Sequence, residues 1–192
     1  APAPVVNEQI KEEFKAGIME PTLKALQSEG IDFKGIIYFG LMIKDGQAKV
    51  LEYNVRFGDP EAQVVLPLLE TDLVDIMEAV IEENLYQIEI KWKDKKALCV
   101  VMASGGYPIE YKKGKEITGI KRAESAEDII VFQAGTKLED GKLLTAGGRV
   151  LAVTALGDEF KEVIKKAYAG VEKINFEDFH IRNDIGSKAV GK

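Results

Sequence analysis

The segment that decides the fold runs from Lys49 to Glu61 and reads Lys-Val-Leu-Glu-Tyr-Asn-Val-Arg-Phe-Gly-Asp-Pro-Glu. Apolar and polar side chains alternate through its first part, and alternate side chains on a β-strand share a face. One face of this strand would be apolar and consist of Leu51, Tyr53, Val55 and Phe57. The opposite face would consist of Glu52, Asn54 and Arg56, with neighbours roughly 6.5–7 Å apart.

The polar face has the chemistry of a site for a metal ion and phosphate. Glu52 and Asn54 offer hard oxygens, which Mg²⁺ prefers when it also holds substrate phosphates. Arg56 offers a planar fork of donors that suits phosphate. The alternative is an amphipathic hairpin strand whose polar face is only solvated, and alternation by itself would favour that simpler structure.

The residues after the strand predict the start of a helix. Gly58 permits a tight turn, Asp59 can cap a helix and Pro60 suits the first helical position. This short helix would run from Pro60 to Leu66 and end at Pro67. Its N-terminal N–H groups would attract anions beside the polar face of the strand.

The residues before the strand predict that it belongs to a β-hairpin. Asp45-Gly46 lies between two apolar runs, which is typical of a hairpin turn. The register decides which side chains meet across the hairpin. A two-residue turn would pair Gly40 with Leu51, whereas a bulge of one residue would pair Gly40 with Glu52 on the opposite face.

Helical periodicity lies on both sides of the hairpin. Apolar residues recur at helical spacing from Asn7 to Glu29, where Asn7 is a suitable N-cap and Pro21 predicts a kink or a new segment. After the hairpin, Thr71 or Asp72 should begin a further helix.

The whole pattern predicts an α+β protein with two domains, residues 1–93 and residues 94–192. The second domain would be small, antiparallel and rich in strands. The predicted strands of the chain are residues 34–43, 48–57, 97–103, 116–120, 129–133, 142–145 and 148–156, and a last helix covers residues 158–171.

The composition is that of an acidic globular protein. Its net charge of −6 argues against nucleic acids and anionic membranes as partners. The single Cys99 lies in an apolar run and is most simply a reduced core residue. No apolar run approaches the roughly 20 residues of a membrane helix, and the first residues lack the features of a secretory signal. We therefore expect a cytoplasmic protein.

The segment from Glu52 to Gln63 resembles the signature of the glycinamide ribonucleotide synthetase family, the phosphoribosylamine–glycine ligases of the ATP-grasp superfamily. Further blocks resemble this family in the same order, at residues 35–43, 100–108, 132–136, 147–157 and 182–186. The resemblance implies the C-terminal portion of a longer enzyme. It would comprise the end of an ATP-grasp domain, with a β-hairpin and helices, and then the small domain. The missing N-terminal portion of the enzyme would be its partner.

The resemblance also implies a reaction. Glycine would be ligated to 5-phosphoribosylamine through glycyl phosphate, with ATP as co-substrate and Mg²⁺ or Mn²⁺ as cofactor. Glu52 and Asn54 would hold the metal ion, and Arg56 would be the catalytic residue that balances charge on the transferred phosphoryl group. Many ATP-grasp relatives have a metal-binding carboxylate where this chain has Gly40, so few protein ligands are expected. The substrates would be bound by Gly58, Asp59, Pro60 and Arg149.

Two other functions compete with this one. Another ATP-grasp carboxylate–amine ligase would share the motif up to Arg56, but such enzymes usually diverge after that position. A non-catalytic docking fragment would fold and bind the missing lobe without reacting alone. The only histidine, His180, has no second metal-type ligand at useful spacing, and we expect a structural or surface role for it.

Overall fold

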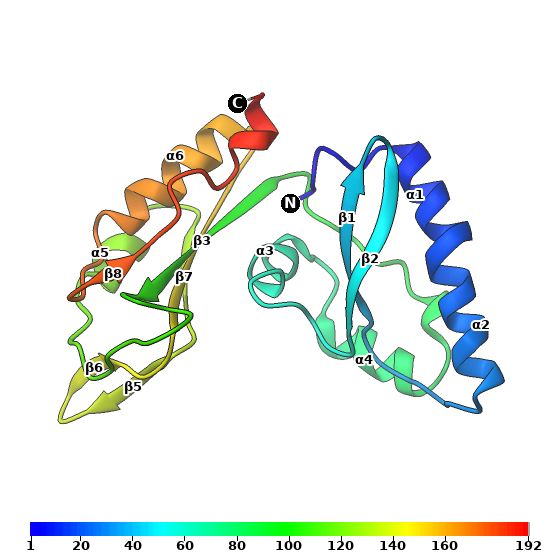
Figure 1. Cartoon of the computed structure of the whole chain (residues 1–192), viewed down its shortest axis with the longest axis horizontal. Coiled ribbons are helices and arrows are strands. Elements are labelled where there is room, and N and C mark those ends of the chain that lie inside the picture. Colours follow the sequence, from blue (N-terminus) through cyan, green and yellow to red (C-terminus); the bar gives the residue numbers. More distant parts are fainter. Residues whose placement is uncertain (192) are drawn as a thin grey trace. The chain divides into compact units, whose positions relative to one another are not determined.

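The computed structural model describes residues 1–191, which divide into two compact units (Figure 1). The hairpin unit consists of residues 3–59 and 69–92. The sheet unit consists of residues 1–2, residues 60–68 and the chain from residue 93 onward. Each unit contains helices and antiparallel strands, so the predicted α+β class is confirmed. The division into residues 1–93 and 94–192 stays a prediction.

Helical segments open the hairpin unit. α1 spans Glu8–Phe14, a π-helical turn spans Lys15–Met19 and α2 spans Glu20–Ser28. The predicted N-cap is confirmed, because Oδ1 of Asn7 accepts a hydrogen bond of 2.9 Å from a backbone N–H three residues on. Pro21 lies in the first turn of α2, so a new segment begins there as expected.

A bulged hairpin follows these helices. β1 (Tyr38–Lys44) and β2 (Gln47–Asn54) form an antiparallel pair. Gly40 pairs with Glu52, and the register shift at this point leaves Leu51 as the extra residue of a β-bulge. Of the two registers considered from the sequence, the bulged one is therefore confirmed.

Both strands of the hairpin are shorter than predicted. β1 begins at Tyr38 rather than near residue 34, and β2 ends at Asn54 rather than at residue 57. Tyr38 is the partner of Asn54, so β2 has no neighbour in this hairpin to pair with beyond that residue. Arg56 consequently lies in a bend after the strand rather than within it.

Aromatic side chains hold α1 against the hairpin. The ring centroids of Phe14 and Phe39 lie 5.1 Å apart, and those of Phe39 and Tyr53 lie 5.3 Å apart. Both pairs are edge-on, and such pairs contribute about 0.5–1.5 kcal/mol each beyond their burial. These contacts fix the hairpin that carries the candidate site.

The hairpin unit is completed by α4 (Leu73–Ile81) and a 3₁₀ turn (Leu85–Gln87). Asp72 caps α4 as predicted, since its Oδ1 accepts a hydrogen bond of 2.8 Å from the second N–H of the helix. Lys34 forms an ion pair with Glu83 after α4. The hydrogen bond from Lys34 lowers the pKa of the Glu83 carboxyl.

The segment after the hairpin differs from the helix predicted for it. A turn comes first, then α3 (Ala62–Val65) and a 3₁₀ turn (Leu66–Leu68). The residue before α3 is Glu61, so Asp59 lies too far from the helix to cap it, and that prediction is wrong. Pro67 does not end the segment. It lies where α-helix changes to 3₁₀ helix, because a proline lacks the N–H for an α-helical hydrogen bond.

The sheet unit is built on an antiparallel sheet with the strand order β4-β7-β3-β8. Its strands are β3 (Lys96–Ser104), β4 (Ile129–Gln133), β7 (Arg149–Gly157) and β8 (Phe179–His180). The other elements are α5 (Ile120–Glu124), a hairpin of β5 (Thr136–Glu139) and β6 (Lys142–Thr145), α6 (Phe160–Val171) and a 3₁₀ turn (Ser187–Val190). None of the helices within residues 1–191 has the length and apolar character to cross a membrane.

The strand predicted at residues 116–120 is not formed. This segment makes isolated bridges, from Glu116 to Leu144 and from Thr118 to Asn175. Because these bridges are to two different segments, no continuous ladder of β-sheet hydrogen bonds forms. β5, β8 and α5 lie outside the predicted elements, because each is short and none of them has a periodic apolar pattern that separates it from a loop.

The central sheet is covered on both faces. On one face its strands share a core with α6, made of Leu98, Val100, Met102, Val153, Ala155, Val163, Ala167 and Phe176. On the other face Leu68 packs against Ala97 and Leu156. There the hydroxyl of Thr154 donates a hydrogen bond of 2.9 Å to the carbonyl of Gln63. Burial on both faces explains the nearly continuous apolar runs of β3 and β7.

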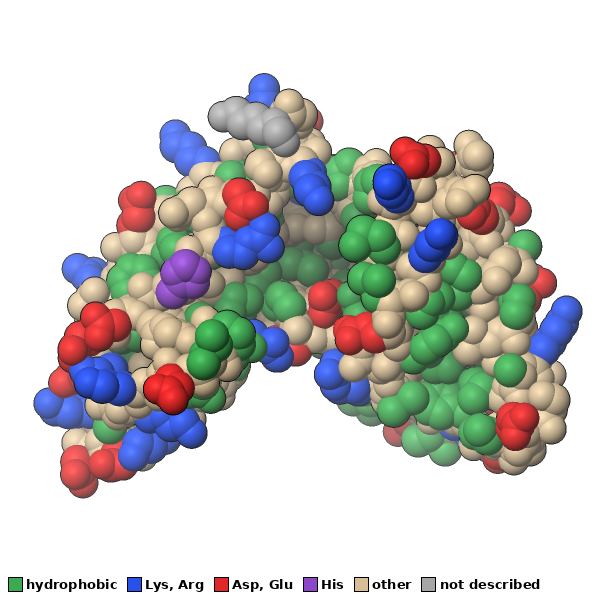
Figure 2. Space-filling view, viewed as in Figure 1, with side chains coloured by type: hydrophobic (Ala, Val, Ile, Leu, Met, Phe, Trp, Pro, Cys, Tyr) green, Lys and Arg blue, Asp and Glu red, His purple; other side chains and the backbone are tan. Residues whose placement is uncertain are grey.

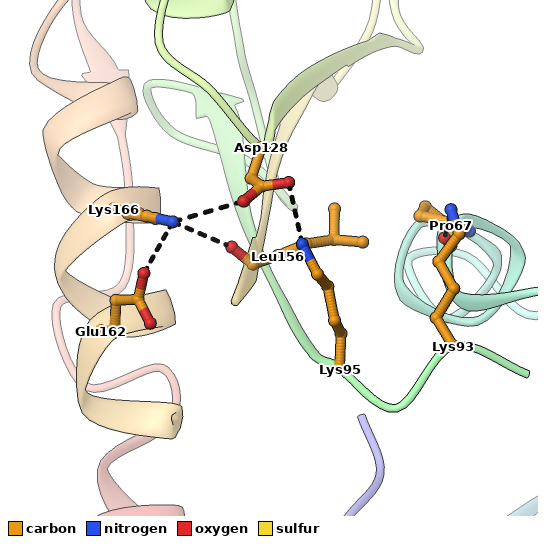
Figure 3. Close-up of polar contacts among 7 residues, drawn as sticks. All are labelled: Pro67, Lys93, Lys95, Asp128, Leu156, Glu162 and Lys166. Carbon is orange, nitrogen blue, oxygen red and sulfur yellow. Dashed lines mark hydrogen bonds and ion pairs between the residues drawn. The ribbon is translucent and has the colours of Figure 1, made fainter. Parts of the chain in front are cut away.

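Polar side chains join α6 to the edge strand of the sheet (Figure 3). Asp128, next to β4, accepts hydrogen bonds of 3.4 Å from both Lys95 and Lys166. Lys166 also forms an ion pair of 2.7 Å with Glu162, one turn earlier in α6. The hydrogen bond between them raises the pKa of Lys166 and lowers the pKa of Glu162.

Candidate functional site

Glu52 and Asn54 lie side by side on β2, as the alternation predicts. Nδ2 of Asn54 donates a hydrogen bond of 3.1 Å to Oε1 of Glu52. Glu52 is exposed and Asn54 is half-buried, so a ligand can reach both side chains in this unit. The bond orients the carboxylate next to the amide and keeps two kinds of oxygen donor close together.

Gly40 lies directly across the hairpin from this pair. It is buried, and a Cβ atom placed on it would lie only 2.8 Å from Cγ of Glu52. The aliphatic part of the Glu52 side chain therefore occupies the space that a side chain at position 40 would need.

Glu52 and Asn54 suit a hard cation whose other ligands are water and substrate oxygens. Within residues 1–191, no group of three or more His, Cys, Asp or Glu side chains could hold a metal ion. The hydrogen-bonded pair on β2 offers one carboxylate and one amide, at Glu52 and Asn54. Mg²⁺ is commonly bound by one or two carboxylates together with water and substrate phosphates, so these residues suit it.

Arg56 lies in the bend that follows β2, two residues after Asn54. It follows the end of β2, is exposed, and donates a hydrogen bond of 2.7 Å from Nη1 to the carbonyl of Phe57. A guanidinium has five N–H groups, so this contact leaves donors for a phosphate. β2 ends at Asn54, so Arg56 is not part of the strand, and its place on the face of Glu52 stays a prediction.

Gly58, Asp59 and Pro60 form the connection after the hairpin. Gly58 is buried, whereas Asp59 is exposed in the turn before α3. Because α3 is only four residues long, it supplies no extended helix N-terminus for an anion. Any contact of these residues with a substrate would come from the turn itself.

Arg149 belongs to the sheet unit, where it is the exposed first residue of β7. Its Nη1 lies 3.5 Å from the hydroxyl of Tyr107. The neighbouring Gly148 is buried under the Tyr107 ring, because a Cβ there would lie 2.1 Å from Cδ2 of that ring. The two glycine-containing loops of the sheet unit thus pack together and place Arg149 at their surface.

A cavity of about 420 Å³ lies beside these loops in the sheet unit, lined by Gly105, Glu110, Tyr111, Lys112, Lys115, Glu177 and Asp178. Lys115 forms an ion pair with Glu177 at its wall, and this hydrogen bond lowers the pKa of Glu177. No local pattern predicts this cavity, because Lys115 and Glu177 are 62 residues apart in the chain.

Two segments of the chain match known protein families. Residues 1–62 match the family model described as "Phosphoribosylglycinamide synthetase, ATP-grasp (A) domain", and these residues include β1, β2 and the Glu52–Asn54 pair. Residues 97–188 match the model described as "Phosphoribosylglycinamide synthetase, C domain". The class is therefore that of ATP-grasp proteins, with a further domain that follows the ATP-grasp part.

Relatives narrow the class to one family. The chain is 50% identical over 191 residues to the phosphoribosylamine–glycine ligase of Synechocystis sp., covering 98% of this chain and 45% of that protein. It is 48% identical over 187 residues to the ligase of Caldanaerobacter subterraneus, covering 97% and 44%. The crystal structure of the ligase from Thermotoga maritima matches with a TM-score of 0.81 and 34% identity, covering 96% of this chain and 44% of that one.

The chain belongs to the phosphoribosylglycinamide synthetase family. It spans less than half of the length of the relatives it matches, and it corresponds to their C-terminal part.

Proposed function

We propose that this chain is part of an ATP-dependent ligase that joins glycine to 5-phosphoribosylamine, a step of purine biosynthesis. The observation that carries the proposal is the Glu52–Asn54 pair, held by a hydrogen bond of 3.1 Å within the segment that matches the ATP-grasp domain. The substrates are inferred from the names of the relatives. The oxygen donors of Glu52 and Asn54 suggest that this chain holds the metal ion.

The reaction has two steps. The carboxylate of glycine attacks the γ-phosphorus of ATP, and the bond to the β-phosphate oxygen breaks to give glycyl phosphate and ADP. The amine of 5-phosphoribosylamine then attacks the acyl carbon, loses a proton and displaces inorganic phosphate. Chemistry of this kind depends mainly on positioning and on neutralising charge at the phosphoryl group.

Glu52 and Asn54 are the residues that would hold Mg²⁺ or Mn²⁺, which supplies positive charge beside the phosphates of ATP. The carboxylate gives the pair a net negative charge, and the amide adds a neutral oxygen. Arg56 would donate from its remaining N–H groups to the phosphoryl group as negative charge moves onto it.

The remaining site residues would bind the substrates. The turn of Gly58, Asp59 and Pro60 would shape the glycine end of the site, and Arg149 would bind phosphate from the sheet unit. The exposed guanidinium of Arg149 beside the Tyr107 hydroxyl supports that role.

An N-terminal portion of the same enzyme would be the partner of the hairpin unit. The apolar side chains of β2 and the bend after it are exposed, with Leu51 at 64%, Tyr53 at 51% and Val55 at 71%. Hydrophobic side chains also gather over this unit in the space-filling view (Figure 2). A two-stranded hairpin is marginal by itself, and exposed apolar patches are typical of surfaces that bind a partner.

An isotope experiment on the longer enzyme tests the proposed reaction. Glycine whose carboxylate carries a heavy oxygen isotope is supplied with ATP and 5-phosphoribosylamine, and the released phosphate is analysed by mass. We expect one labelled oxygen in the phosphate, because the carboxylate oxygen that attacks ATP leaves with it. Unlabelled phosphate, or faster turnover with another amino acid than with glycine, would contradict the proposal.

A further inference from the structure

Gly40 occupies a position in β1 that its own backbone does not require. Its φ lies outside the left-handed region, so an L-residue could adopt the same backbone conformation. Glycine in the interior of a strand is unfavourable, because it loses much conformational entropy and packs no side chain. The reason for a glycine here must therefore come from a neighbour.

That neighbour is Glu52. The bulge at Leu51 brings Glu52 directly opposite Gly40, and side chains at facing positions of an antiparallel pair share the same patch of the sheet. A Cβ on residue 40 would lie 2.8 Å from Cγ and 3.6 Å from Cδ of Glu52. Moving only the carboxylate of Glu52 would not relieve this contact, because the position of Cγ depends on the χ1 torsion of Glu52.

A change of χ1 at Glu52 would separate Glu52 from Asn54. The staggered rotamers of χ1 differ by about 120°, so the next one would swing the carboxylate to another side of the strand. The hydrogen bond of 3.1 Å from Asn54 to Oε1 of Glu52 would then be lost. The two oxygen donors would no longer lie side by side.

We infer that Gly40 is a positioning residue for the metal ligand Glu52, and that it acts by leaving the space in which the Glu52 side chain lies beside Asn54. This inference rests on the proposed function, because it assigns a purpose to the site proposed there. The bulge and the glycine work together, since only the bulged register places Gly40 opposite Glu52.

The test is an equilibrium titration of Mn²⁺ in the longer enzyme, followed by electron paramagnetic resonance with a non-hydrolysable ATP analogue present. Gly40→Ala should weaken Mn²⁺ binding about 10–100-fold, the usual effect of disturbing a group that orients a metal ligand. Gly17→Ala is the matched control, because a Cβ at that position would meet nothing within 4 Å, and it should bind Mn²⁺ normally. Normal binding by Gly40→Ala would overturn the inference.

Two further variants make every outcome decisive. Glu52→Gln tests the metal site itself. Normal Mn²⁺ binding by this variant would remove Glu52 as the metal ligand of the proposed function. Weak binding by Glu52→Gln together with normal binding by Gly40→Ala would overturn only the role of Gly40.

Glu52→Ala removes Cγ, so adding Gly40→Ala to it should cause no further loss of Mn²⁺ binding. If Gly40→Ala alone fails to fold, the double variant should restore the circular dichroism of the folded protein, and an unfolded double variant would overturn the inference.

Discussion

Glu52 and Asn54 are two residues apart, and their hydrogen bond places a carboxylate and an amide on one side of β2. An ATP-dependent ligase needs positive charge to be held beside the phosphates, and a ligand pair oriented before substrate arrives avoids reorganisation during the reaction. Each residue of this site can therefore be tested by itself.

Glu52→Gln keeps the shape of the side chain and removes its charge. In the longer enzyme, we expect kcat to fall roughly 10²–10³-fold at saturating metal, the usual cost of losing one preorganised charge-stabilising group. Steady-state ADP formation measures the effect. Glu20→Gln, in the first turn of α2, is the control and should leave kcat unchanged. Near-normal activity of Glu52→Gln would remove the metal-ligand assignment.

Arg56→Lys tests the shape of the cation rather than its charge. Lysine keeps one positive charge but loses the planar fork that binds phosphate through two parallel hydrogen bonds. We expect kcat to fall at least about 10-fold, since roughly one charged hydrogen bond of 1.5–3 kcal/mol is lost. Lys49→Arg, the opposite exchange at an exposed position of β2, is the control and should leave kcat unchanged. A fully active Arg56→Lys enzyme would mean that Arg56 supplies only a diffuse positive charge.

Sequence reasoning reached Glu52 and Asn54 because strand alternation alone puts them on one face. The end of β2 was predicted three residues too late, because the length of this strand depends on where its partner begins, and the start of β1 at Tyr38 has no local signal. Sequence reasoning left two registers open for Gly40, since a bulge is decided by packing across the hairpin rather than by the turn sequence.

Among the secondary-structure elements, α6 and β4 are joined by the Lys166 network (Figure 3). The hydrogen bond from Lys166 lowers the pKa of Glu162, so this contribution to stability is complete above the ordinary glutamate pKa of about 4.3 and is lost as the pH falls through the lowered value. The raised pKa of Lys166 works in the opposite direction: its contribution is complete below the ordinary lysine pKa of about 10.4 and is lost as the pH rises through the raised value.

Lys166→Met should therefore flatten the pH dependence of thermal stability at both ends. We expect the melting temperature of the variant to fall less steeply than that of the parent below about pH 4.3 and above about pH 10.4. The measurement belongs at low ionic strength, because these groups are exposed and salt screens them. Lys165→Met, the adjacent residue of α6, is the control, and an equal flattening by it would contradict the role of the network.

The substitution Gly148→Ala tests how the two glycine-containing loops beside Arg149 pack together. Alanine at this position would place a methyl group 2.1 Å from the Tyr107 ring, an overpacking that typically costs about 1–3 kcal/mol. Denaturant unfolding of the chain should show a loss of that size for Gly148→Ala. Combining it with Tyr107→Ala should recover part of the loss, and additive effects of the two changes would contradict the contact.

Longer elements were easier to predict than short ones. The strands at residues 97–103 and 148–156 and the helix at residues 158–171 are found with small shifts at their ends, because each has a long apolar or periodic run. β8 could not be predicted, since its two residues are held by pairing with the end of β3 rather than by any preference of their own. The failed strand at residues 116–120 has the same cause, because its bridges are to residues distant in sequence.

For the whole molecule, the two units differ in how completely they are covered. The sheet unit buries its central strands β3 and β7 on both faces, whereas the hairpin unit exposes Leu51, Tyr53 and Val55. The family relatives are more than twice as long as this chain, and the proposed partner of the exposed face is their N-terminal part. The exposed face therefore predicts that the hairpin unit works only together with that part.

The most direct test of this account is phosphate release from ATP in the presence of glycine and 5-phosphoribosylamine, comparing the chain alone with the chain mixed with the N-terminal portion of the same enzyme. We expect phosphate release in the mixture, dependence of that release on both substrates, and its loss when the chain carries Glu52→Gln. Phosphate release that is unchanged by Glu52→Gln, or no release from a mixture in which both parts are folded, would contradict this account.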